Sequence, residues 1–131
     1  MFSEKELQYL QSQRLARIAT VSASGEPDVA PVAFIFDGER FLVGGIDNKN
    51  TIKYHNTKAT GRAALVVDDF PSTDPPQPRG IKIHGKASIV QAEGRAGAGE
   101  YIEIIAERLW SWGIEAPAFS QGKPVIKRVR K

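Results

Sequence analysis

Short apolar segments with alternating side chains, separated by brief turn sequences, constrain this chain more than any other feature. The predicted strands cover residues 17–22, 28–36, 40–45, 62–68, 80–90 and 101–106. A period of two is typical of strands with one buried face. Connections as short as these join antiparallel neighbours. An open antiparallel sheet would leave exposed edges, which closure into a barrel removes. We therefore expect an all-β fold, a six-stranded antiparallel barrel with two short helices.

Two stretches depart from this pattern and predict the helices. Ser3 followed by Glu6 is a capping box, and Phe2 and Leu7 can form the hydrophobic staple across it. Leu7 and Leu10 then indicate a first helix of about ten residues. Its apolar side is narrow, so we expect this helix to lie over an opening in the sheet. A second, shorter helix is expected over residues 51–57.

Prolines and small residues mark the predicted breaks in the sheet. Pro31 lies inside the second strand, where it cannot donate to a ladder, so it indicates an edge, a bulge or a gap. Residues 69–79 contain four of the eight prolines and are predicted to form a stiff loop at the rim. The Gly/Ala-rich residues 92–99 are predicted to be a connection.

Length and composition fit a single domain over residues 1–131, with a C-terminal tail from about residue 116. The chain has no cysteine, which excludes disulfides and thiolate chemistry. No apolar run approaches the roughly 20 residues that span a bilayer. The first five residues lack the basic start and the apolar segment of a signal peptide. We therefore expect a cytoplasmic protein with no membrane partner.

The distribution of charge bears on nucleic acid as a partner. The net charge is +3, but the last nine residues carry five basic side chains and no acid. These are Lys123, Lys127, Arg128, Arg130 and Lys131. A polyanion-binding surface should spread its basic residues over one face of the fold. A basic tail on a mildly acidic body argues against a nucleic-acid partner.

The segment between the third strand and the second helix is the candidate ligand site. Gly44 and Gly45 follow an apolar strand end and are expected to turn the backbone through conformations closed to other residues. Asn48, Asn50 and Thr51 are good residues to begin a helix. A helix N-terminus favours a phosphate, because its N–H groups are unpaired and it carries a partial positive charge.

The lysines in the same segment also favour an anion site. Lys49 and Lys53 are four residues apart and Asn56 is three further on, so the three side chains would share one face of a helix. This pattern indicates an anion site. It also fits a plain strand-to-helix connection with solvated lysines, and the spacing alone leaves both interpretations open.

Several motifs, in their order and spacing, resemble the pyridoxamine 5′-phosphate oxidase-like superfamily. The motifs are Arg17-Ile18-Ala19-Thr20-Val21, Gly25-Glu26-Pro27, Pro31-Val32, Lys53 with Asn56, Arg62-Ala63-Ala64-Leu65-Val66, and Arg79-Gly80 with His84-Gly85-Lys86-Ala87. Gly44-Gly45 and Ser111-Trp112-Gly113-Ile114 are similar to the branch described as deazaflavin (coenzyme F420)-dependent enzymes. The resemblance implies an FMN-binding-protein-like split β-barrel, and a homodimer with two cofactor sites along its interface.

The resemblance also assigns roles to particular residues. Lys53 and Asn56 would hold the cofactor phosphate and its neighbouring hydroxyls, with Thr51 and Asn48 assisting and Lys49 as a further cofactor-binding residue. Main chain around Pro31, Val32 and Ala33 would lie along the ring system, and Arg79, Gly80 and Ile81 of the partner subunit would close the other side. Many relatives carry an extra arginine or serine near the helix start, where this chain has Lys49, Asn50 and Thr51. A lysine is a point charge without the bidentate fork of arginine, so the resemblance leaves open which phosphate oxygens are held.

The leading hypothesis is an oxidoreductase in which reduced coenzyme F420 delivers hydride to a small conjugated acceptor. The alternatives are an FMN-binding reductase or oxidase of the same fold, a non-catalytic carrier of the cofactor, and a barrel that binds nucleic acid through the basic tail. In such enzymes the cofactor performs the redox step and the protein binds and orients it. No side chain stands out as a catalytic proton donor, so solvent is expected to supply the proton.

Histidines and tryptophans carry weaker signals. His55 and His84 are isolated in the sequence, and two separate histidines do not predict a metal site. Trp110 and Trp112 near the C-terminus are more typical of packing or dimer contacts than of ligand contacts.

Overall fold

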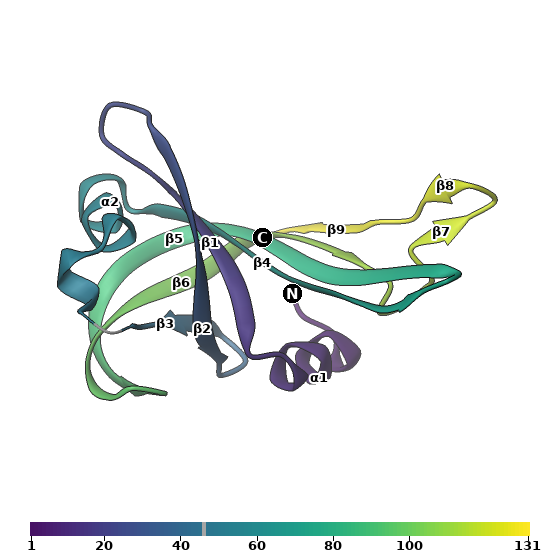
Figure 1. Cartoon of the computed structure of the whole chain (residues 1–131), viewed down its shortest axis with the longest axis horizontal. Coiled ribbons are helices and arrows are strands. Elements are labelled where there is room, and N and C mark those ends of the chain that lie inside the picture. The colour runs from purple at the N-terminus through teal and green to yellow at the C-terminus, as the bar shows by residue number, and fades with distance from the viewer. Residues whose placement is uncertain (46) are drawn as a thin grey trace.

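A closed ring of six antiparallel strands forms the body of the protein (Figure 1). The computed structural model describes residues 1–45 and 47–131. The barrel strands are β1 (Leu15–Val21), β2 (Pro27–Phe36), β3 (Arg40–Val43), β4 (Arg62–Thr73), β5 (Pro76–Gly94) and β6 (Gly97–Trp112). They pair in the order β3-β2-β1-β4-β5-β6, and β6 also pairs with β3, which closes the ring. The predicted all-β split-barrel fold is confirmed.

Alternating apolar side chains of these strands fill the barrel. Phe34, Phe41, Ile83 and Ile104 are among the largest side chains that are fully buried there. The long strands β5 and β6 shift register between His84 and Gly85. A β-carbon at Gly85 would lie 2.2 Å from a main-chain oxygen of β6, so the bulge that bends the two strands needs glycine.

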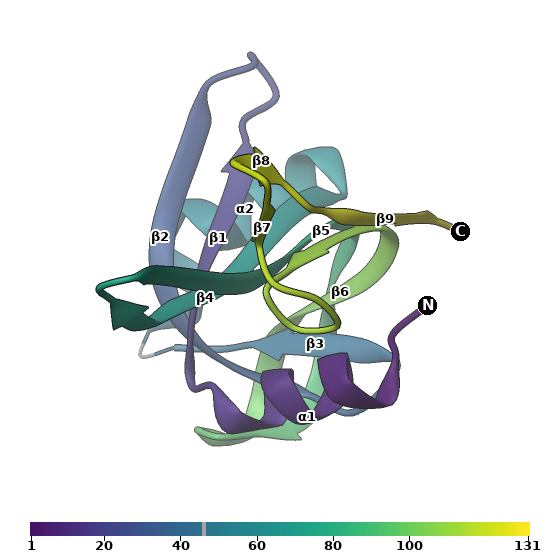
Figure 2. The ribbon, with the colours of Figure 1, turned by 90° about the vertical axis from the view of Figure 1, so that its right-hand side faces the viewer.

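Helix α1 (Glu4–Ser12) lies across the lower end of the barrel in Figure 2. The predicted capping box is present: the Glu6 N–H donates to the Ser3 side chain, and the Ser3 N–H donates to the Glu6 carboxylate. Tyr9 and Leu10 join the barrel core. The narrow apolar side of the helix therefore covers one end of the sheet, as its sequence predicts.

Strand β2 has one free edge, and this edge positions the site. Its residues 27–33 pair with β1 only, and the ladder with β3 begins after them, at Phe34–Phe36. Pro31 lies in the singly paired part, opposite Arg17 of β1. The prediction that Pro31 marks an edge or a gap is confirmed, because its missing N–H falls where the described strands leave β2 without a second neighbour.

Two segments predicted to be loops are strands instead. Residues 69–79 continue the β4–β5 hairpin, which turns at Asp74-Pro75. The register shift between Asp69 and Ser72 leaves Pro71 outside the ladder, so the prolines do not break the pairing. Residues 92–99 continue the β5–β6 hairpin, which turns at Arg95-Ala96. The proline-rich and Gly/Ala-rich compositions predict loops, but pairing with the neighbouring strand decides the conformation in both places.

The C-terminal segment contributes to the sheet as well. Strands β7 (Phe119–Ser120) and β8 (Lys123–Pro124) form a small hairpin, and β9 (Lys127–Arg130) pairs with β6. Residues 127–130, which the sequence places in a tail, are therefore a seventh strand beside the barrel. Of the described helices, none is long and apolar enough to cross a membrane.

Candidate functional site

A cleft of about 360 Å³ opens along the free edge of β2. Its floor is apolar and is formed by Pro31, Val32, Ala33, Phe34, Ile35 and Leu42. Its mouth is formed by Gly44, Gly45, Lys53, Arg95, Ala96 and Tyr101. The free edge explains the shape, because none of the described strands covers the main chain of residues 31–33 on that side. An apolar floor with a few charged groups at the mouth is typical of a small-molecule site.

Lys53 brings a positive charge to this cleft from the first turn of α2 (Ile52–Thr60). Its side chain is half-buried. No carboxylate of the described residues lies within ion-pair distance of its ammonium group. Burial lowers the pKa of Lys53, and the charge of Asp28 partly opposes this effect. A half-buried cation without a partner is costly, and an anionic ligand would relieve that cost.

Arg95 supplies a second cation to the same cleft, and the sequence analysis missed it. It lies in the turn between β5 and β6, and its Nε donates to the main-chain oxygen of Phe34 at 3.0 Å. That bond fixes the guanidinium group over β2, and no hydrogen bond within the described residues engages its remaining N–H groups, which can therefore meet a ligand. No local signal marks Arg95, because only the barrel closure brings its turn next to β2.

Tyr101 forms the wall beside the two cations, and glycines make room for it. A β-carbon at Gly44 would lie 2.5 Å from the Tyr101 ring, and one at Gly94 would lie 2.4 Å from it. The ring is buried, and its hydroxyl donates to the main-chain oxygen of Gly97 at 2.6 Å. Gly44 and Gly45 are not among the residues with positive φ, so the predicted backbone reason for them is wrong. Gly44 is required by the ring, whereas a β-carbon at Gly45 would meet only the flexible end of the Lys53 side chain, at 4.0 Å from its ammonium nitrogen.

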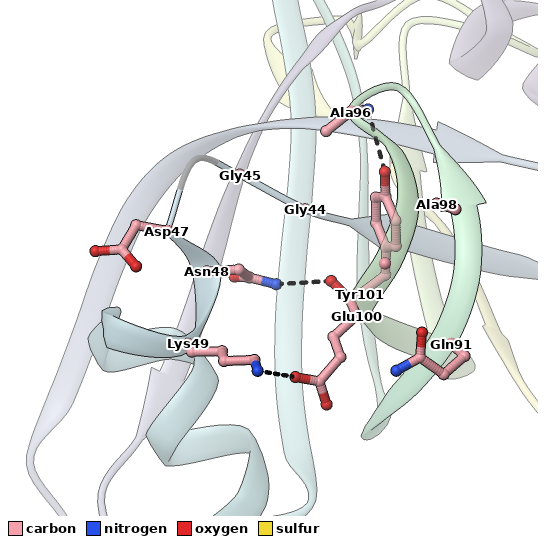
Figure 3. Close-up of a pocket in the computed structure, with 11 residues that line it drawn as sticks. Gly44, Gly45, Asp47, Asn48, Lys49, Gln91, Ala96, Ala98, Glu100 and Tyr101 are labelled. Carbon is pink, nitrogen blue, oxygen red and sulfur yellow. Dashed lines mark hydrogen bonds and ion pairs between the residues drawn. The ribbon is translucent and has the colours of Figure 1, made fainter.

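A second cavity of about 670 Å³ lies on the other side of the glycine pair. Figure 3 shows Lys49 pointing at Glu100, with 3.6 Å between the ammonium and the carboxylate. The amide of Asn48 donates to the main-chain oxygen of Glu100 at 3.3 Å, and the Tyr54 hydroxyl donates to its carboxylate. Asp47 adds another acid to this wall. The acidic lining disfavours an anion here, so the two cavities differ in the charge they accept.

The family described as pyridoxamine 5′-phosphate oxidase matches residues 2–128. The chain belongs to this family. It is also 41% identical over 120 residues to a 5a,11a-dehydrotetracycline/5a,11a-dehydrooxytetracycline reductase of Streptomyces rimosus, an alignment that covers 87% of this chain and 84% of the reductase.

Solved structures agree with the family at the level of the fold. An FAD-binding protein of Mycobacterium smegmatis matches with a TM-score of 0.60 and 17% identity over 82% of this chain and 91% of its own. A heme-binding protein of the same organism matches with a TM-score of 0.66 and 15% identity over 99% of this chain and 59% of its own. At these identities the likeness concerns the barrel fold alone. The two solved structures bind different cofactors on this fold, so the fold does not identify a cofactor.

The helix start that the family resemblance singles out is partly as predicted. Thr51 is the N-cap of α2 and accepts from the Tyr54 N–H at 3.3 Å. The predicted shared face of Lys49, Lys53 and Asn56 is wrong. Lys49 lies in a separate 3-10 turn, η1 (Asn48–Asn50), because the helix begins only at Ile52.

The structure also keeps Asn56 and Asn48 away from the β2 cleft. Asn56 is 6% exposed, and its amide donates to Thr20 of β1 at 3.1 Å. Asn48 is buried beside Glu100 and lines the second cavity. Of the polar side chains predicted in this segment, Lys53 is the one that reaches the cleft, together with the predicted main chain of Pro31, Val32 and Ala33.

Arg79, Gly80 and Ile81 do not line the cleft of their own chain. Arg79 pairs with Asp69, at 2.7 Å and 3.0 Å, and stacks on the ring of Tyr9. Ile81 is buried in the core, and Gly80 makes room for the Trp112 ring. The turn of their hairpin and α2 lie at opposite ends of the molecule in Figure 1. Their contribution from a partner subunit stays a prediction.

Proposed function

We propose that this protein is an oxidoreductase that uses the deazaflavin coenzyme F420 to reduce a small conjugated organic acceptor. The observation that carries the proposal is the unpaired, half-buried Lys53 at the mouth of an apolar cleft. The cleft offers a surface for a planar ring next to a group for a charged arm. The 41% identical reductase of Streptomyces rimosus supports reduction of a dehydro compound as the type of reaction.

The residues present fit such a coenzyme. Lys53 and Arg95 would hold the anionic arm, Lys53 as a point charge and Arg95 through its free N–H groups. The apolar floor at Pro31, Val32 and Ala33 would lie along the ring. Thr51 would act indirectly, because it fixes the first turn of α2 and so the direction of the Lys53 side chain.

The bound coenzyme supplies the hydride, and the chain supplies binding, orientation and exclusion of water. Lys53, Arg95 and Tyr101 are the titratable side chains of the cleft lining. The Tyr101 hydroxyl already donates to a main-chain oxygen, and the two cations would face the anionic arm of the coenzyme. Solvent therefore delivers the proton that completes reduction of the acceptor.

We further propose that the protein acts as a homodimer whose partner closes the cleft. Val29 is 68% exposed, and Pro31 is exposed two residues along the same strand, so apolar side chains follow the outer face of β2 up to the cleft, with Leu15 and the charged Arg17 on the paired part of β1. Such a row of exposed apolar side chains favours burial against another protein surface. Arg79, Gly80 and Ile81 of the second subunit would then complete the site.

The proposal is tested by turnover with purified protein. Reduced coenzyme F420 is mixed with 5a,11a-dehydrotetracycline, or with simple enone and quinone acceptors, and coenzyme oxidation is followed by absorbance. Oxidation that depends on the protein and on the acceptor supports the proposal. Binding of F420 without turnover of any acceptor would make the protein a carrier. Tight binding of FMN with none of F420 would favour an FMN reductase or oxidase of the same fold.

A further inference from the structure

The outer face of β5, β6 and β9 carries a cluster of basic and aromatic side chains. Strand pairing places these residues in two parallel rows on one side of the sheet. One row is Lys82, Trp110 and Arg128, and the other is His84, Arg108 and Arg130. Directly paired residues in antiparallel strands point to the same face, and so do residues two apart along a strand. We call these six residues the outer basic cluster.

Trp110 is the centre of the outer basic cluster. The Lys82 ammonium lies 4.3 Å from the centroid of its ring, and the Arg108 guanidinium lies 4.6 Å from it. The His84 ring centroid is also 4.6 Å away. The indole is half-buried, so part of it remains accessible when a flexible cation moves aside.

The positive charge of the outer basic cluster is not compensated. Among the described residues, no carboxylate lies within ion-pair distance of Lys82, Arg108, Arg128 or Arg130. The acids that border it are already engaged, Asp68 with Arg17 and Glu107 with Arg62.

Burial lowers the pKa of the His84 imidazole, and the charges of Lys82, Arg108 and Arg62 lower it further. The same positive potential that opposes a proton on His84 attracts an anion.

The fold also removes the argument from sequence against a nucleic-acid partner. In the sequence, Arg128 and Arg130 look like part of a tail separate from the body. Because β9 pairs with β6, these two cations lie beside Arg108 and Trp110 on one continuous surface. Basic residues spread over one face are the footprint that a nucleic-acid surface requires.

We propose that the outer basic cluster binds single-stranded nucleic acid. Arg108, Arg128, Arg130 and Lys82 contact successive phosphates, and Lys82 and Arg108 leave the ring of Trp110 as they do so. A base then stacks on the exposed indole. A basic surface with an aromatic platform is suited to a single strand, because unpaired bases present their ring faces.

The test measures binding of a fluorescently labelled single-stranded DNA oligonucleotide to the full-length protein by anisotropy. We expect Arg108→Ala/Arg128→Ala to weaken binding at least tenfold. The matched control, Lys5→Ala/Arg14→Ala, removes the same charge from exposed positions near α1 and should retain the affinity. With four phosphate contacts the slope of log K against log salt should be about −2.8, and about −1.4 in the cluster variant.

Trp110 separates a nucleic-acid site from a general attraction to anions. Stacking should quench tryptophan fluorescence with the oligonucleotide but not with heparin, and Trp110→Ala should weaken binding of the oligonucleotide alone. The proposal is overturned if the oligonucleotide does not bind at low salt, if the control variant loses as much affinity as the cluster variant, or if Trp110→Ala affects heparin equally. Coenzyme binding to the same variants should be unchanged, so the two proposals fail independently.

Discussion

Replacement of Glu6 by glutamine should strongly destabilise the protein, because the Glu6 carboxylate joins both ends of the chain. Glu6 lies in α1, and its side chain is fully buried on the inner side of this helix. It accepts hydrogen bonds from the Ser111 hydroxyl at 2.6 Å, the Lys127 ammonium at 3.0 Å and the Ser3 N–H at 2.8 Å. A glutamine of the same shape keeps an acceptor for the Ser3 N–H and Lys127, and its amide N–H can donate to the Ser111 hydroxyl, but it removes the negative charge that faces the Lys127 ammonium.

The expected loss follows from the burial of the two partners. Removing one member of a buried ion pair costs about 3–5 kcal/mol. The Lys127 side chain is 36% exposed, so water can solvate part of its charge when Glu6 is lost. We therefore expect Glu6→Gln to lower the free energy of unfolding by about 2–4 kcal/mol, somewhat less than for a fully buried pair. For a domain of this size the midpoint of thermal unfolding should fall by roughly 8–16 °C.

The assay is thermal and urea unfolding followed by circular dichroism at neutral pH. Glu4→Gln is the matched control, since Glu4 lies on the same helix but is exposed. It should cost well under about 1 kcal/mol. A loss for Glu6→Gln as small as that of the control would refute the claim that Glu6 holds the C-terminal strand to α1.

The same contact predicts how stability depends on pH. Burial alone would raise the pKa of Glu6, but the hydrogen bonds from Ser111, Ser3 and Lys127 outweigh it and hold the pKa below its ordinary value. A lowered carboxyl pKa gives stability that is present above the pKa of the unfolded chain and is lost as pH falls through the folded value. The difference in stability between wild type and Glu6→Gln should therefore shrink in acid, below about pH 4.3.

Two further predictions concern the cleft. Gly44→Ala should cost about 1–3 kcal/mol in unfolding experiments, because its β-carbon would press into the buried Tyr101 ring. A β-carbon at Gly45 would meet only the flexible end of Lys53, at 4.0 Å, so Gly45→Ala should be tolerated. Equal effects of the two would contradict the fit we describe. Arg95→Ala should weaken coenzyme binding about tenfold in a fluorescence titration with little change in stability, and an unchanged affinity would remove Arg95 from the site.

The parts of the fold that depend on local pattern could be predicted. The alternation of apolar and polar side chains predicts the six strands. Ser3 and Glu6 predict the start of α1, and Pro31 predicts the free edge of β2. Each of these signals acts through the residue's own backbone or its near neighbours. Lys53 could be found for the same reason, since the caps that begin α2 are adjacent to it.

What was missed depends on contacts between segments far apart in the chain. The prolines of residues 69–79 indicate a loop until β4 and β5 are seen to pair around Pro71. Arg95 reaches the cleft only because its turn crosses to Phe34 of β2. Asn56 looks like a ligand residue in sequence, yet Thr20 of a separate strand holds its amide in the interior.

The most direct test of the proposed site is a paired titration of coenzyme F420 and FMN against wild type, Lys53→Gln and Lys58→Gln. Lys58 lies on the same helix but is exposed, so its variant is the control for loss of charge. Our account predicts that Lys53→Gln weakens the coenzyme that binds best by about 10- to 100-fold, the loss of a hydrogen bond between charged groups, and that Lys58→Gln has no effect. Unchanged affinity for both coenzymes in Lys53→Gln would contradict it.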